Sequence, residues 1–196
     1  MVILLFRHGH KTFSIDNDPP LSPKGFEQAH HLTQLIFDQK IPQATHCWVS
    51  EKIRTFQTLE KAIDQYQLTT YKKSDLNHRE AGENSTQFRQ RVQKFLHELG
   101  TRAKETEVHY ICTHYDWIEE ALSLIDCDKD LSSYEYASWS PGQYLVFDLI
   151  DQNIYNSIIT ELNPIQDETN LSLSAAKKDI IKIDETALDK HIKSSI

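Results

Sequence analysis

The sequence predicts an α/β fold, a three-layer α/β/α sandwich built around a mainly parallel central sheet. Short apolar runs typical of buried strands alternate with longer segments whose apolar residues recur at helical spacing. Strands that alternate with helices favour right-handed crossovers, which place helices on both faces of a parallel sheet. The chain has 196 residues and 39% hydrophobic content, so it can bury one sizeable core.

The strand signals begin at the N-terminus, where the apolar run Val2 to Phe6 predicts a buried strand over residues 1–6. Short β-branched and aromatic runs predict the other strands. These lie at 45–49, 68–72, 108–113, 144–150 and 155–161.

Four helices are predicted between the strands. The first begins with Ser22 as its N-cap and Pro23 at its first position. The apolar stripes expected to face the core are Phe26, Ala29, Thr33, Ile36 and Phe37; then Ile53, Phe56, Leu59, Ile63 and Tyr66; then Phe88, Val92, Phe95 and Leu99. A short fourth helix is expected from about Trp117 to Ile125.

The composition changes after this α/β pattern ends. Residues 163–196 are rich in Asp, Glu, Lys, Ser and Thr and contain no Phe, Trp or Tyr. One weak amphipathic helix is one interpretation of Ala175, Ile180, Ile181, Leu188 and Ile192, and disorder is the other. We therefore expect one domain over residues 1–162 and a polar C-terminal extension over 163–196.

Charge and cysteine content narrow the class of protein. A formal net charge of -8 without a visible basic face argues against nucleic acid or an acidic membrane as a partner. No segment approaches the length of a membrane span, and the first apolar run is too short for a signal peptide. Cys47, Cys112 and Cys127 are odd in number and lack metal-ligand spacing, so we expect reduced thiols in a cytoplasmic protein. The sequence does not indicate an oligomeric state.

Polar residues follow three of the predicted strands where each strand ends. Arg7 and His8 come after the first strand, Arg54 follows the second, and His114 follows the strand over 108–113. The carboxyl ends of parallel strands meet at one edge of a sheet, where α/β proteins bind ligands. Guanidinium groups bind phosphate oxygens bidentately and stay charged. The pattern therefore predicts a phosphate site with two arginines and two histidines.

In their order along the chain, these motifs resemble those of the histidine phosphatase superfamily, also called phosphoglycerate mutase-like. The resemblance covers roughly residues 1 to 162. Within the superfamily, the chain is similar to the compact phosphatase branch. The motifs that carry it are Arg7-His8-Gly9; Asp18 to Gly25 with Gln28-Ala29; Ser50 to Thr58; Gly82-Glu83-Asn84-Ser85; and His114.

The resemblance implies a phosphoglycerate mutase-like fold and a metal-independent phosphomonoester or phosphohistidine hydrolase that needs no cofactor. It implies that His8 is the nucleophile and forms a phosphohistidine intermediate, while Arg7, Arg54 and His114 hold the phosphoryl oxygens. The expected substrate is a phosphorylated small molecule or a phosphohistidine protein.

The group that protonates the leaving alkoxide stays open. Glu80 is the first candidate for this general acid, and His78 and Glu83 are alternatives; relatives often carry Glu where this chain has His78. Residues expected at the substrate are Gly9, His10, Ser14 and Glu83.

Other functions fit the same residues less well. Phosphoryl transfer of the phosphoglycerate mutase type is one alternative, but the stretch from Gly9 to Leu21 is short, which favours hydrolysis. A non-catalytic, phosphate-binding regulatory module is another. A zinc hydrolase could use His8, His10 and His114 with Glu80 or Asp16, but the neighbouring arginines would repel the cation.

Overall fold

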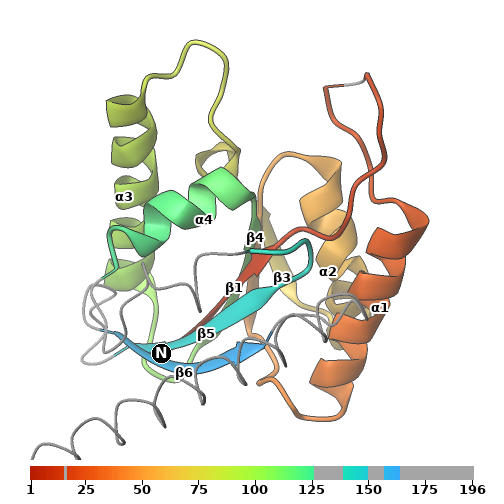
Figure 1. Ribbon diagram of the computed structural model, residues 1–196. Helices are drawn as coiled ribbons and strands as arrows, with labels where there is room; N and C mark the ends of the chain where they lie inside the picture. Colours follow the sequence, from red (N-terminus) through yellow and green to blue (C-terminus); the bar gives the residue numbers. More distant parts are fainter. Residues whose placement is uncertain (16, 126–138, 150–156, 164–196) are drawn as a thin grey trace, which may run out of the picture. The chain divides into compact units, whose positions relative to one another are not determined.

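The computed structural model describes residues 1–15, 17–125, 139–149 and 157–163, all within the compact unit Met1–Ile165, and it confirms the predicted α/β class (Figure 1). The strands form one sheet of six in the order β3-β2-β4-β1-β5-β6. Their bounds are β1 (Val2–Arg7), β2 (His46–Val49), β3 (Thr69–Lys72), β4 (Val108–Thr113), β5 (Tyr144–Leu149) and β6 (Ser157–Asn163). Each predicted strand is present, with ends shifted by at most two residues.

The sheet is mainly parallel, as predicted. β4 pairs in parallel with both β1 and β2, and β2 pairs in parallel with β3. β5 is antiparallel to both of its neighbours, β1 and β6. In the central register Arg7 lies opposite Thr113, and Val49 lies opposite Cys112. The carboxyl ends of β1, β4 and β2 therefore stop at nearly the same level of the sheet.

The four predicted helices are present, and a short 3-10 helix precedes the third. The helices are α1 (Pro23–Phe37), α2 (Ile53–Tyr66), α3 (Ser85–Arg102) and α4 (Tyr115–Leu122), with η1 at Ser74–Leu76. The Ser22 hydroxyl caps α1 by accepting from the backbone N–H of Gly25. Asn84 and Gln87 form a reciprocal capping box at the start of α3.

Helices cover both faces of the sheet, with α1 and α2 on one side and α3 and α4 on the other (Figure 1). The side chains of β1 show why, because Ile3 and Leu5 belong to one buried cluster and Leu4 and Phe6 to the other. A strand buried on both faces carries a continuous apolar run rather than an alternating one. The predicted three layers are confirmed.

Two residues of the predicted α1 stripe do not face the core. Phe26 and Phe37 are 46% and 64% exposed, whereas Ala29, Thr33 and Ile36 are buried as expected. At 3.6 residues per turn, both phenylalanines lie roughly 120° or more around the helix from the buried Leu32. They therefore lie to the side of the buried stripe.

The cysteine prediction is confirmed for Cys47 and Cys112, which are free and buried. Cys127 lies outside the described residues, and so does the C-terminal extension beyond Asn163. No helix in the described part of the chain is long and apolar enough to cross a membrane.

Candidate active site

The predicted phosphate-binding residues meet at the carboxyl ends of three neighbouring strands. His8 follows β1, Ser50 follows β2 and His114 follows β4, while Arg54 lies in the first turn of α2. All four of these residues are buried. The strand order β2-β4-β1 places their three strands side by side, so the sheet itself assembles the site.

The His8 ring is held in one tautomer. Its Nδ1 lies 2.7 Å from the carbonyl oxygen of Gly9, which can only accept, so Nδ1 carries the proton. The Nε of Arg54 donates to Nε2 of His8 over 3.2 Å, so Nε2 presents its lone pair. Burial, first, and then the charges of Arg54, Arg7 and Lys11 together lower the pKa of His8 to about 3. A neutral imidazole with its lone pair on Nε2 has the form of a nucleophile.

Arg54 also reaches the second histidine. Its Nη2 donates to Nδ1 of His114 over 3.2 Å, so Nε2 of His114 carries the proton and donates to the Ser50 hydroxyl over 2.9 Å. The rings of His8 and His114 meet edge to face at 5.2 Å. Burial, followed by the nearby His8 and Arg54, strongly lowers the pKa of His114. Both histidines are therefore neutral around a shared guanidinium.

The two arginines have different partners. Arg54 pairs with Asp18 at 3.4 Å, and Asp18 also accepts from the backbone N–H of Ile53 at the start of α2. Arg7 donates to the carbonyl of Trp139, and its guanidinium lies 5.2 Å from the centre of the Tyr115 ring. The Nε of Arg7 is buried and has no hydrogen-bond partner in the part of the chain that the structure describes. Arg7 therefore keeps an unused donor at a position where an anion can bind.

Close packing fixes the segment that carries His8. A Cβ at Gly9 would lie 3.0 Å from the carbonyl oxygen of Gly25, and a Cβ at Gly25 would overlap the carbonyl oxygen of His10. Thr58 accepts from the backbone N–H of Gly9 over 2.9 Å, and Gln28 accepts from that of His10 over 2.8 Å. These contacts clamp the end of β1 against α1 and α2.

These groups open onto a cavity of about 410 Å³. Its lining includes five residues of the predicted site, namely Arg7, His8, His10, Arg54 and His114, together with His78, the alternative acid. The remaining described lining residues are Lys11, Thr12, Phe13, Tyr115, Asp116 and Pro141. With two arginines and Lys11 against the single acidic residue Asp116, the lining favours an anionic ligand.

Four predicted site residues, Gly9, Ser14, Glu80 and Glu83, lie outside the described lining of this cavity, and Gly9 contacts the lining residue His8. Ser14 is exposed on the loop that follows His10. Glu80 is also exposed, and its carboxylate accepts from the side-chain amide of Asn77 over 3.0 Å. Glu83 forms a bidentate pair with Arg91 at 2.7 and 2.8 Å, and this bond is the main cause that lowers its pKa. A carboxylate held ionised in this way is poorly suited to donate a proton.

Sequence reasoning missed about half of the lining. Lys11, Thr12 and Phe13 directly follow the Arg7-His8-Gly9 motif, so closeness in sequence was an available signal. Asp116, two residues after His114, was a further one. Pro141 had no local signal, because the pairing of β5 with β1 brings it to the site.

The arrangement argues against zinc at this edge of the sheet. The guanidinium of Arg54 donates to the Nε2 of His8 and to the Nδ1 of His114, so a cation already faces both nitrogens. Nδ1 of His10 is bonded to the Ser22 hydroxyl at 2.7 Å. Asp16, another candidate ligand, lies outside the described residues.

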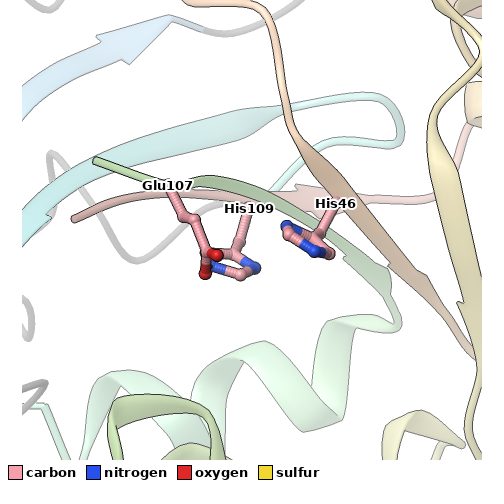
Figure 2. A group of neighbouring side chains, drawn as sticks. All are labelled: His46, Glu107 and His109. Carbon is pink, nitrogen blue, oxygen red and sulfur yellow. The ribbon is translucent and has the colours of Figure 1, made fainter. Parts of the chain in front are cut away.

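A second group of metal-ligating side chains, His46, Glu107 and His109, lies near the opposite ends of β2 and β4 (Figure 2). Their ligand atoms lie within 4.8 Å of one another. The indole N–H of Trp48 donates to Nδ1 of His109, so Nε2 of His109 keeps the proton that a metal would have to displace. The two imidazoles stack at 5.0 Å with 18° between their planes, so their lone pairs do not converge on one point. This cluster does not form a ready metal site.

Histidines and arginines gathered at the carboxyl edge of a mainly parallel sheet define an α/β protein with a basic anion site. Residues 3–83 match the family model described as the histidine phosphatase superfamily, branch 1. This part of the chain, which holds Arg7, His8 and Arg54, is similar to the histidine phosphatase superfamily.

One relative with an assigned function shares a short segment with this chain. Over 62 residues, 30% of this chain, the sequence is 44% identical to 6-phosphofructo-2-kinase/fructose-2,6-bisphosphatase 4 of Rattus norvegicus. That segment spans only 13% of the rat protein's length.

Solved structures share the fold at low sequence identity. The protein histidine phosphatase SixA complexed with tungstate matches at 16% identity and a TM-score of 0.66, over 84% of this chain and 97% of that one. Alpha-ribazole phosphatase from Shigella flexneri matches at 20% identity and a TM-score of 0.66, over 84% of this chain and 97% of that one. Phosphoserine phosphatase from Entamoeba histolytica, in complex with 3-phosphoglyceric acid, matches at 14% identity and a TM-score of 0.61, over 83% of this chain and 96% of that one.

Proposed function

We propose that this chain is a phosphatase that hydrolyses phosphomonoesters or phosphohistidine through a phosphohistidine intermediate on His8. The observation that carries the proposal is the state of His8, a buried neutral imidazole with Nδ1 protonated and the Nε2 lone pair beside Arg54. The phosphatases among the structural neighbours support a related activity, and their substrates differ from one another. We assign this activity to residues 1–162.

The proposed reaction has two displacements on phosphorus. In the first, Nε2 of His8 attacks in line, the N–P bond forms, and the bond from phosphorus to the leaving oxygen breaks. In the second, water attacks the phosphohistidine, the N–P bond breaks, and inorganic phosphate leaves. The hydrogen bond from Nδ1 to the Gly9 carbonyl stabilises the positive charge that the ring gains on attack.

Arg7, Arg54 and His114 hold the three equatorial oxygens in this proposal. The unpaired Nε–H of Arg7 and the Arg54 guanidinium supply fixed charge where negative charge is shared in the transition state. These groups take the electrostatic part that metal ions supply in other phosphoryl transfer enzymes, so we propose that the reaction needs no metal. Phosphoryl transfer of the mutase type would use the same first step.

The proton for the leaving oxygen is assigned from the cavity. Glu80, the first choice from the sequence, is exposed and outside the described lining, so we transfer this role to His78. The His78 ring meets that of His114 edge to face at 5.2 Å and lines the cavity, which supports this assignment.

The test is to trap the intermediate. Wild-type protein mixed with a ³²P-labelled phosphomonoester and quenched in base should retain label that acid removes. His8→Ala should retain none, and His30→Ala, a surface histidine on α1, should label like the wild type. Label that persists in His8→Ala refutes the assignment. Turnover should also survive EDTA, and activity lost to EDTA and restored by zinc refutes the metal-independent mechanism.

A further inference from the structure

We propose that Phe13 forms an apolar subsite for the leaving group, so that preferred substrates are phosphate esters with apolar carbon next to the phosphate. This inference rests on the proposed function, because the subsite belongs to the same cavity as His8 and Arg54.

The Phe13 side chain lines that cavity although it is 101% exposed. A single exposed apolar residue is ordinary on a protein surface and does not by itself indicate a ligand. The position of this one does, because the side chain lines a basic cavity and is left fully exposed by the described residues around it. A ligand that covers it removes apolar surface from water, which favours binding.

The loop that carries Phe13 is fixed at its base, so the backbone just before Phe13 is held near the phosphate site. Lys11 and Leu21 form an isolated antiparallel bridge, and the backbone N–H of Thr12 donates to the carbonyl of Pro20 over 2.9 Å. The side chain of Gln57, on α2, accepts from the backbone N–H of Leu21 over 2.8 Å. Phe13 comes one residue after these contacts, and Figure 1 shows the loop that joins β1 to α1 extending beyond the end of α1.

The rest of the lining agrees with an apolar leaving group. Tyr115 and Pro141 add carbon surface to that of Phe13. Among the described lining residues, Lys11 is the only cation besides the two arginines assigned to the phosphate, so a second anionic group would find little charge to pair with. The volume of about 410 Å³ falls within the range of about 300–1,000 Å³ that is typical of sites for whole organic molecules.

The test uses n-alkylphosphonates, which bind as phosphate analogues but cannot be hydrolysed. Their affinities from methyl to hexyl are measured by titration calorimetry. In the wild type each added methylene should tighten binding about two- to fourfold until the chain passes the subsite, the range for partial to full burial of a methylene. Phe13→Ser should bind methylphosphonate normally but lose most of the dependence on chain length, and Phe13→Leu should keep part of it.

Ile15 provides the matched control. It is 103% exposed on the same loop but lies outside the described lining of the cavity, so Ile15→Ser should keep the wild-type slope. An unchanged slope in Phe13→Ser, a flat series in the wild type, or no binding of any phosphonate overturns the subsite. If affinity rises with chain length as expected but the protein hydrolyses no phosphate ester, the subsite is supported. The phosphatase proposal is then overturned.

Discussion

Arg54 donates a hydrogen bond from its Nε to Nε2 of His8, the nitrogen that would attack phosphorus, over 3.2 Å. In the free protein the guanidinium thus occupies the lone pair of the proposed nucleophile. Phosphate oxygens are stronger acceptors than a neutral imidazole, because hydrogen bonds between charged groups are the stronger ones. Substrate binding would therefore draw Arg54 away and release the lone pair as the phosphorus arrives.

Arg54→Ala should lower kcat/KM by about two to four decades, the scale for loss of one preorganised contact to the transition state. Arg54→Lys should recover only part, because an ammonium cannot donate to His8 and His114 through one planar group. Steady-state kinetics on an aryl phosphate measures both. Arg89→Ala, which removes a surface arginine paired with Glu120, serves as the control. Full activity in Arg54→Ala would remove Arg54 from the mechanism.

The general acid can be identified from leaving-group dependence. His78→Ala should slow an alkyl phosphate by about two decades, the usual scale for acid catalysis, and slow an aryl phosphate much less because phenolate leaves unaided. Glu80→Gln and Glu83→Gln should leave the ratio of the two rates unchanged. If Glu80→Gln produces the selective loss instead, the acid is the residue first expected from the sequence. Asp116→Asn completes the series, since its carboxylate also lines the cavity.

The site residues that could be predicted are those whose position follows from the path of the backbone at the end of a strand. A residue directly after a parallel strand must lie at the ligand edge, so Arg7, His8 and His114 could be placed without knowledge of tertiary contacts. The mainly parallel sheet and the three layers followed from the alternation of strand and helix patterns, whereas the order of the strands in the sheet was not predicted.

The direction in which a loop side chain points could not be predicted. Asn77 is buried and bonds Glu51 and Glu80 through one amide, and Arg91 reaches across from α3 to hold Glu83. These partners are distant in sequence or belong to another element, so the spacing around residues 76–83 does not reveal them. The prediction that Phe26 faces the core was wrong for a related reason, because the burial of one α1 face depends on where that helix lies on the sheet.

The protein should lose stability as pH falls from about 6.5 towards 4. Burial, then the neighbouring His46, lowers the pKa of His109 to about 4, while an unfolded histidine keeps a pKa near 6.5. Between these values the unfolded state binds the extra proton, so protonation favours unfolding, by at most about 1.4 kcal/mol per pH unit for one such group. Urea unfolding of wild type and His109→Asn at pH 7.5 and 5 measures this. The variant should show the smaller loss, and equal losses would contradict the assignment.

Gly25→Ala should both destabilise the protein and impair turnover. The new methyl group would overlap the carbonyl oxygen of His10, and relief requires α1 and the His8 segment to move apart. Overpacking of this kind costs about 1–3 kcal/mol. Thermal unfolding and kcat/KM should fall together, whereas Glu27→Ala, on the exposed side of the same helix, should change neither much. A fully active Gly25→Ala protein would show that the clamp does not position the nucleophile.

The contacts that hold the segment from Gly9 to Leu21 at its two ends divide the residues there into two groups. Mutations in the first group affect the reaction, and mutations in the second affect only the rim of the cavity. Hydrogen bonds to Thr58, Gln28 and Gln57 and the contact of Gly9 with Gly25 are made by residues that also position the reacting groups, so mutation there damages chemistry. Residues 13–15, just beyond these contacts, are exposed and bury no core surface. Substitutions at residues 13–15 should therefore change the rim of the cavity with little loss of folding stability. A family that keeps one reaction can in this way diversify what it acts upon, and this loop is the place to randomise when a different specificity is wanted.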